Sequence, residues 1–256
     1  MQMKITSRQN PLIVRLSKLS DKKHRDEEGL FRIDGVKLYD EAVRSHIDIR
    51  YVFIKAGMDG IAADTGAEIF EVTDEVLSKL TDEKAPQGIV AFAEKFLTLP
   101  VPAKLPRTFR ALMLSSVRDP GNLGTIIRTA YAFGVDRVFI SPDCADIYSP
   151  KVIRAAMGTI FRQNITVSDE LETTQTLKKA GCTVFAAALR PDALEVGAFA
   201  LPERVCFAVG NEGHGLSDEL IEAATGTVII PMTEGCESLN AAGAAGILSW
   251  EMRKMF

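Results

Sequence analysis

The sequence predicts an α/β protein whose larger part is a mostly parallel sheet covered by helices. From residue 111 onward, short apolar segments rich in Val, Ile and Phe alternate with helical segments, as in sheets built from crossover units. A proline-rich segment, residues 96–108, separates this part from a smaller α/β region. We therefore expect a first domain at 1–97, a linker at 98–107 and a second domain at 108–256.

The composition is that of a globular protein with a real core. Of the 256 residues, 46% are hydrophobic and 25% are charged, with a net charge of -4. That charge argues weakly against a nucleic-acid partner. The nearest two of the four cysteines are 24 residues apart, so we expect reduced thiols in the cytoplasm and no metal site. No apolar run is long enough to span a bilayer, so no membrane partner is expected.

The first 25 residues are strongly basic, with seven Lys or Arg and one Asp. Asn10 and Pro11 mark a helix start, and Leu12, Leu16 and Leu19 follow at helical spacing. The basic side chains occupy the other faces. They could contact RNA phosphates or simply form a solvated surface. The predicted RNA contacts here are Arg8, Arg15, Lys22, Lys23 and Arg25.

The rest of the first domain alternates strands and helices without a recognisable catalytic motif. We predict strands at 30–33, 49–54, 69–72 and 89–93, with helices at 36–43 and 73–80.

The second domain shows the same alternation over a longer stretch. Predicted strands lie at 111–114, 137–140, 183–188, 205–209 and 228–230. Predicted helices lie at 125–133, 152–161, 176–180 and 216–224, and a last helix opens at Ser238, a preferred N-cap residue.

Three polar loops follow predicted strand ends, at 119–124, 210–215 and 232–240. Ligands of parallel sheets bind outside the carboxyl ends of the strands, so these loops predict the site. The glycines of the second loop allow backbone to approach a ligand closely. No lysine follows them as in a nucleoside triphosphate site, and there is no GxSxG or HExxH motif. The absence of GxGxxG argues against a nucleotide-binding oxidoreductase.

The last helix begins with small residues only, from Ala241 to Gly246. Glycine within a helix costs about 0.5–1 kcal/mol relative to alanine, so Gly243 and Gly246 predict close packing. The neighbour could be another core element or a partner subunit.

Three separated segments resemble the three motifs of the SpoU family of RNA ribose 2′-O-methyltransferases. They read SVRDPGNLGTIIRTAYAFGVDRVFIS, FAVGNEGHGLSDEL and VIIPMTEGCESLNAAGAAGILSWE, in the family's order and spacing over residues 112–254. The N-terminal segment NPLIVRLSKLSDKKHRDEEGLFRIDG, with PQGIVAF, resembles the substrate-binding domain often fused to this family. Asp34 stands where relatives usually carry Glu.

The resemblance implies a trefoil-knotted catalytic domain, an L30e-like substrate domain, S-adenosylmethionine (SAM) as methyl donor and a homodimer. It places Arg128 at the ribose 2′-hydroxyl, where stabilising the developing alkoxide asks less of arginine than proton abstraction. A structural pair with Asp119 or Glu212 is the alternative. The other catalytic positions implied are Asn122, Glu212, Ser238 and Asn240. Implied cofactor contacts are Gly210, Asn211, Ile230, Met232 and Leu239, and Arg154 would face RNA.

We therefore predict a SAM-dependent 2′-O-methyltransferase that acts on tRNA or rRNA. RNA is the acceptor because DNA lacks the 2′-hydroxyl. The competing hypothesis is an RNA-binding or ribosome-associated factor that has kept the fold without the chemistry.

Overall fold

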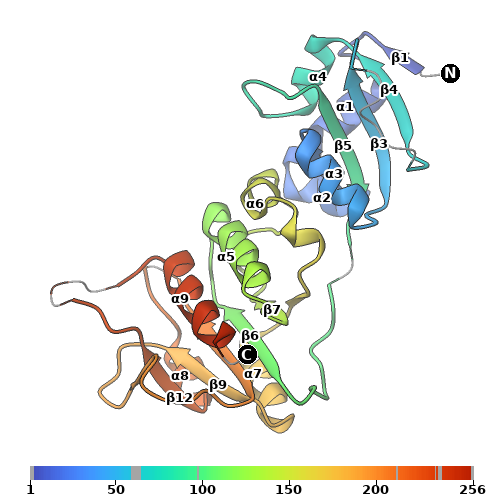
Figure 1. The fold of residues 1–256 in the computed structure, drawn as a ribbon. Helices are drawn as coiled ribbons and strands as arrows, with labels where there is room; N and C mark the ends of the chain where they lie inside the picture. Colours follow the sequence, from blue (N-terminus) through green and yellow to red (C-terminus); the bar gives the residue numbers. More distant parts are fainter. Residues whose placement is uncertain are drawn as a thin grey trace. The chain divides into compact units, whose positions relative to one another are not determined.

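The computed structural model describes residues 3–58, 65–96, 98–211, 213–233, 235 and 238–254 (Figure 1). The chain forms two compact units. The first comprises Met1–Leu97 with Asp146–Phe161, and the second comprises Thr98–Ala145 with Arg162–Phe256. Within the described residues, no helix is both long enough and apolar enough to cross a membrane.

The first unit is built on a mixed sheet of five strands in the order β1-β4-β3-β5-β2. β1, β4 and β3 run parallel, and β5 pairs antiparallel with both β3 and β2. The strands are β1 (Met3–Ile5), β2 (Leu30–Asp34), β3 (Ile49–Lys55), β4 (Glu68–Val72) and β5 (Ile89–Glu94).

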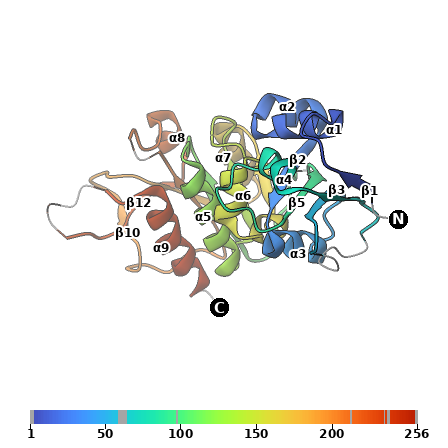
Figure 2. The same cartoon turned by 90° about the horizontal axis from the view of Figure 1, so that it is seen from above.

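Helices cover both faces of this sheet, with α1 and α4 on one face and α3 on the other (Figure 2). Local capping explains their starts. The Asn10 side chain accepts a hydrogen bond from Leu12 N at 2.9 Å, and Thr73 caps α4 in the same way. The helices are α1 (Pro11–Ser17), η1 (Lys18–Ser20), α2 (Lys22–Glu28), α3 (Val36–Arg44) and α4 (Asp74–Leu80).

The segment 146–161 belongs to the first unit although the chain leaves that unit at residue 97. It contains α6 (Pro150–Ala156) and η2 (Thr159–Phe161), and α6 contacts β2. Phe31 of β2 is fully buried, with ring centroids 5.6 Å from Tyr148 and 6.2 Å from Phe161. The core of the first unit thus depends on residues from much later in the chain.

The second unit is built on an all-parallel sheet of seven strands in the order β10-β12-β9-β11-β6-β7-β8. This confirms the predicted parallel α/β architecture. The strands are β6 (Phe109–Leu114), β7 (Arg137–Ile140), β8 (Ile165–Val167), β9 (Thr183–Ala187), β10 (Leu194–Glu195), β11 (Arg204–Val209) and β12 (Gly226–Ile229).

Two pairs of helices enclose this sheet. Figures 1 and 2 show α5 packed beside α9 on one face, and α7 and α8 on the opposite face. Gly246 of α9 faces α5 closely, because a Cβ built at Gly246 would lie 3.7 Å from Thr129 Cγ2. The helices are α5 (Pro120–Ala132), α7 (Glu170–Lys179), α8 (Asp218–Ala223) and α9 (Ala241–Arg253).

Four predicted helix boundaries are wrong. The helix predicted at 176–180 begins at Glu170, and the helix predicted at 152–161 ends at Ala156, where Met157 takes a positive φ of 52°. The other two boundaries are the starts of α5 and α9. The polar segment 119–124 is not a loop. Asp119 caps α5 by accepting from Asn122 N at 2.7 Å, so the helix already begins at Pro120. The last helix is capped by Asn240 rather than Ser238, since Asn240 Oδ1 accepts from Gly243 N at 2.7 Å. A side-chain oxygen three residues before a free amide decides both starts.

Candidate active site at the strand ends of the second unit

A cavity of about 390 Å³ lies at the carboxyl edge of the parallel sheet. Its walls come from the segments that follow β9, β11 and β12, and from the start of α9. The volume falls within the usual range for small-molecule sites, about 300–1,000 Å³. All five predicted cofactor contacts line it: Gly210, Asn211, Ile230, Met232 and Leu239.

Gly210 is a glycine because the loop after β11 folds back on itself. A Cβ at this position would lie 2.2 Å from the carbonyl carbon of Gly215 and 2.6 Å from Leu216 N. Both are backbone atoms, which cannot swing aside. Glycine at position 210 therefore lets the two ends of this loop approach each other closely.

Asn211 ties that loop to the loop after β6. Its Nδ2 donates to Ser116 O at 2.9 Å, and its Oδ1 accepts from Gly213 N at 2.7 Å. Its main chain also exchanges two hydrogen bonds with Gly215. Asn211 thus fixes the shape of the loop as well as lining the cavity.

The loop after β6 contains a strained residue, Ser116, with φ of +56°. Such a backbone costs about 1–3 kcal/mol and persists only when its surroundings enforce it. Ser116 Oγ donates to Asp143 Oδ2 at 2.6 Å, and Ser116 N donates to Ser141 Oγ at 2.9 Å. The hydrogen bond from Ser116, followed by the one from Ser141, lowers the pKa of Asp143 below its ordinary value.

Charged groups are few on the described walls of this cavity. Arg190 and Asp218 are paired with each other, and His214 is the third titratable side chain there. The remaining walls combine apolar side chains, such as Ile230 and Leu239, with backbone of the glycine loop. This mixture fits SAM, whose adenosine part needs apolar surface and backbone partners and whose amino-acid part is zwitterionic.

Of the predicted catalytic residues that the structure describes, only Ser238 lines the cavity. Ser238 lines the cavity, whereas the side chain of Asn240 caps α9. Asn122 lies in the first turn of α5 and, like the rest of segment 119–124, does not line this cavity, although that segment was predicted to be part of the site. Arg128 lies further along α5, is exposed, and makes no hydrogen bond or ion pair with any described residue, Asp119 included. Glu212 lies outside the described residues.

The predicted RNA contacts divide into exposed and engaged side chains. Arg8, Arg15, Lys22 and Lys23 are exposed, and Arg15 Nη2 donates to Tyr51 Oη at 3.1 Å. Arg25, in contrast, is only 3% exposed and donates to Asp146, Leu19 O and Ser20 O. Arg154 is partly buried and lies 3.1 Å from Asp34 and 3.0 Å from Glu83. The geometry gives Arg25 a role within the first unit rather than on its surface.

Two family models match the chain. The SpoU rRNA Methylase family matches residues 110–250, more than half of the chain, and the MRM3-like substrate binding domain matches residues 10–91. The chain belongs to the SpoU rRNA methylase family. The resemblance predicted from the three motifs is confirmed, and so is the one predicted for the N-terminal domain.

Relatives of this SpoU protein match it along nearly its whole length. The 23S rRNA (guanosine(2553)-2′-O)-methyltransferase RlmP of Bacillus subtilis is 32% identical, over 97% of this chain and 98% of RlmP. The AdoMet-bound rRNA methyltransferase from Sinorhizobium meliloti has a TM-score of 0.90 and 31% identity, over 98% of this chain and 97% of that chain. The SpoU methyltransferase AviRb from Streptomyces viridochromogenes, solved with AdoMet, shares the fold with a TM-score of 0.84 and 23% identity, over 96% of this chain and 98% of AviRb.

Sequence reasoning missed several residues that shape the site of this SpoU protein. Asp143 and Ser141 hold the strained Ser116, and Arg190 and Asp218 line the cavity. The signal available for the first pair was a Ser-Pro-Asp sequence directly after a strand end, at 141–143. In the described part of the chain, no group of three or more His, Cys, Asp or Glu could hold a metal ion.

Proposed function

We propose that this protein methylates a ribose 2′-oxygen of ribosomal RNA, with the chemistry in the second unit and RNA selection in the first. As a SpoU protein, it is a SAM-dependent RNA 2′-O-methyltransferase. The observation that carries the assignment of roles is the meeting of three distant segments, after β9, β11 and β12, around one cavity. The names of the relatives support ribosomal RNA as the target class.

The cofactor would be held by Gly210, Asn211, Ile230, Met232 and Leu239, which all line the cavity. When bound, SAM supplies a methyl group already activated by a positive sulfur. The chain must then supply alignment, which contributes up to about 7–11 kcal/mol in well-oriented cases. Asn211 serves this purpose by holding two loops together through Ser116 O. Ser238, on the same cavity wall, and Glu212 would orient the incoming ribose.

Arg128 would stabilise the oxygen that attacks the methyl group. Arginine keeps its proton in proteins, so its useful contribution is charge and directed N–H groups beside the developing alkoxide. Its side chain is exposed and makes no ion pair with described residues, which leaves the guanidinium available to RNA. Asn122 and Asn240 would hold the two loops that flank the substrate.

The first unit would select the RNA through its basic residues. Arg8, Arg15, Lys22 and Lys23 are exposed around α1 and α2, and lysine and arginine displace counterions from phosphates. Family membership supports this role, since the matching model describes a substrate binding domain.

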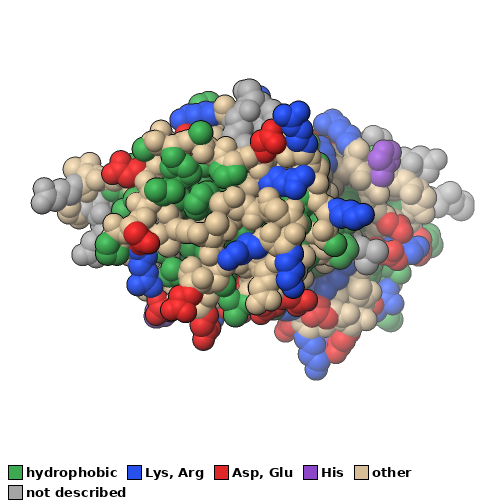
Figure 3. Space-filling model, turned by 90° about the horizontal axis from the view of Figure 1, so that it is seen from below, with side chains coloured by type: hydrophobic (Ala, Val, Ile, Leu, Met, Phe, Trp, Pro, Cys, Tyr) green, Lys and Arg blue, Asp and Glu red, His purple; other side chains and the backbone are tan. Residues whose placement is uncertain are grey.

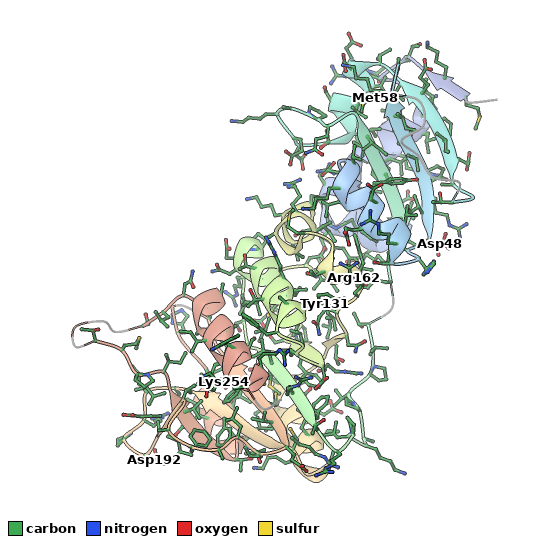
Figure 4. The ribbon with its side chains drawn as sticks, viewed as in Figure 1. Asp48, Met58, Tyr131, Arg162, Asp192 and Lys254 are labelled. Carbon is green, nitrogen blue, oxygen red and sulfur yellow. The ribbon has the colours of Figure 1, made fainter. Side chains whose placement is uncertain are left out.

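The protein would work as a homodimer joined through α5 and α9. Tyr131, Ile247 and Trp250 are 40%, 39% and 50% exposed on these helices. Figure 4 labels Tyr131 and Arg162, whose guanidinium carbon lies 5.3 Å from the centroid of the tyrosine ring. Figure 3 shows exposed hydrophobic side chains of the second unit gathered in a patch. Gathered apolar surface is a feature of interaction sites.

The cysteines support a reducing compartment, and we place the protein in the cytoplasm. Cys182 and Cys206 are buried as free thiols, and Cys144 is half-buried. Burial raises the pKa of Cys182 to about 12, so this thiol stays protonated and unreactive near neutral pH.

The decisive experiment supplies purified protein with radiolabelled SAM and protein-free ribosomal or transfer RNA. We expect label in a 2′-O-methylated nucleotide of rRNA. Label in tRNA alone would show that the substrate is tRNA and not rRNA. Binding of SAM without label in any RNA, or no binding at all, would favour the RNA-binding factor without chemistry.

A further inference from the structure

The first unit contains a second, smaller cavity, of about 200 Å³, between the β2–α3 turn, the α4–β5 segment and α6. Its walls include Asp34, Gly35, Thr81, Gln87, Arg154 and Met157. All of these residues belong to the first unit, because α6 is part of it. The volume is below that of a typical cofactor site and suits a single heterocyclic ring system.

One carboxylate oxygen on this cavity's wall has no hydrogen-bond partner in the part of the chain that the structure describes. The Asp34 side chain is 6% exposed; its Oδ2 accepts from Arg32 Nε at 3.1 Å and from Arg154 Nη1 at 3.1 Å. Its Oδ1 is buried and has no hydrogen-bond partner among the described residues. An ionised carboxylate can only accept, so a ligand that satisfies Oδ1 must bring an N–H or O–H donor.

The same wall supplies a donor beside that acceptor. Arg154 is 31% exposed and is held between Asp34 and Glu83. A matching ligand would carry a hydrogen-bond donor for Asp34 next to an acceptor for Arg154. Nucleobases have edges with this arrangement. Other parts of the wall are polar, including Lys37 and Glu83, whereas Ile89, Val90 and Met157 supply apolar surface that suits the faces of a ring.

The turn that carries Asp34 is rigidly set. Gly35 has φ of +89°, which favours glycine, and its N donates to Ile89 O at 3.1 Å. Arg32, which is 2% exposed, anchors the turn from beneath by donating to Asp34, Leu80 O and Asp82. The cavity is thus preformed and does not depend on a ligand for its shape.

We propose that this cavity binds one unstacked nucleobase of the substrate RNA, with the base edge against Asp34 and Arg154. Sequence-specific RNA recognition relies on such splayed bases, read at their hydrogen-bonding edges. The inference rests on the proposed function, because the base is taken to belong to the RNA that is methylated. With such a site, the first unit would recognise the base sequence of the RNA as well as its phosphates.

The test uses the full chain with 15N-labelled glycine and the nucleotides GMP, AMP, CMP and UMP as probes. At least one nucleotide should shift the Gly35 amide resonance in a saturable way, and the strongest identifies the base. Asp34→Asn should weaken that binding at least tenfold. The matched control is Asp82→Asn, which removes another partner of Arg32 but does not line the cavity, and should change the affinity less than twofold.

A second variant covers the case in which Asp34→Asn fails to fold. Gln87 is an exposed residue of the cavity wall, so Gln87→Trp should block the cavity and abolish the shift without unfolding the protein. No shift with any nucleotide, unchanged binding in Gln87→Trp, or equal weakening by the two aspartate variants would overturn the proposal.

The proposed function can fail separately. If the wild-type protein does not bind S-adenosylhomocysteine, the proposed cofactor site in the second unit is wrong. The nucleotide titration of the first unit does not depend on that result. With rRNA as substrate, Asp34→Asn should raise KM at least tenfold with kcat within twofold.

Discussion

At the scale of single residues, the exposure of the Arg128 side chain decides what effect its removal should have. Because the side chain is exposed and makes no ion pair with described residues, Arg128→Ala should leave folding intact. We expect single-turnover methyl transfer to fall by about 10²–10³, the usual loss for one oxyanion-stabilising donor. S-adenosylhomocysteine affinity, measured by calorimetry, should stay within twofold. Arg107→Ala is the control, since Arg107 is an exposed arginine of the same unit. Full activity in Arg128→Ala would remove Arg128 from the mechanism.

Asp143 gives a prediction on pH, because hydrogen bonds from Ser116 and Ser141 lower its pKa in the folded protein. A lowered folded pKa stabilises the protein fully above the unfolded value of about 3.9, and this stabilisation is lost as pH falls through the folded pKa. Asp143→Asn should therefore lower the free energy of unfolding at pH 7. The difference from wild type should shrink below about pH 4, as measured by urea denaturation. Asp192→Asn, at an exposed position, should behave like wild type at every pH. A difference that persists unchanged at acid pH would contradict the assignment.

Side-chain networks between loops mark the limit of sequence reasoning at this scale. The cavity residues Gly210, Ile230 and Leu239 could be predicted because the motifs that resemble the family include them. Gly210 and Ile230 also lie directly after strands. The Ser116–Asp143 contact could not, since it joins residues 27 apart whose approach depends on the order of strands in the sheet. The burial of Arg25 could not be predicted for the same reason, because its partner Asp146 is 121 residues away in the sequence.

At the scale of elements, two glycines of the second unit should respond oppositely to alanine. A Cβ at Gly246 would meet Thr129 Cγ2 at an ordinary contact distance of 3.7 Å, so Gly246→Ala should stabilise α9 by about 0.5–1 kcal/mol. A Cβ at Gly210 would lie 2.2 Å from the backbone of Gly215, so Gly210→Ala should destabilise the loop and weaken S-adenosylhomocysteine binding at least tenfold. Thermal denaturation and calorimetry would measure both. Equal effects of the two changes would contradict the packing described here.

Most elements were predictable because their apolar period and caps agree. α3, β3, β4 and α4 lie within two residues of their predicted bounds. The start of α5 was missed because a Pro-Gly-Asn sequence is typical of turns, while the Asp119 cap makes it the first turn of a helix. The short strands β1, β8 and β10 were missed because two or three residues carry no period. The knot was implied by resemblance alone, since chains are generally expected not to thread loops.

At the scale of the whole molecule, the exposed apolar residues of α5 and α9 predict the assembly state. The double change Ile247→Glu with Trp250→Glu places two charges where apolar surface would be buried. We expect wild type to sediment as a dimer and the variant as a monomer with little methyl transfer. Leu194→Glu is the matched control, because Leu194 is 47% exposed on the edge strand β10 of the same unit. A wild-type protein that is monomeric at micromolar concentration would contradict the dimer.

The excursion of residues 146–161 into the first unit bears on how the protein is synthesised. A nascent chain that has emerged only to residue 97 contains the whole mixed sheet but lacks Tyr148 and Phe161 over Phe31, and Asp146 beside Arg25. It would carry a buried arginine without its carboxylate and an uncovered aromatic ring until about sixty further residues are translated. The N-terminal unit should therefore mature late on the ribosome, after β6, α5 and β7 have already been made.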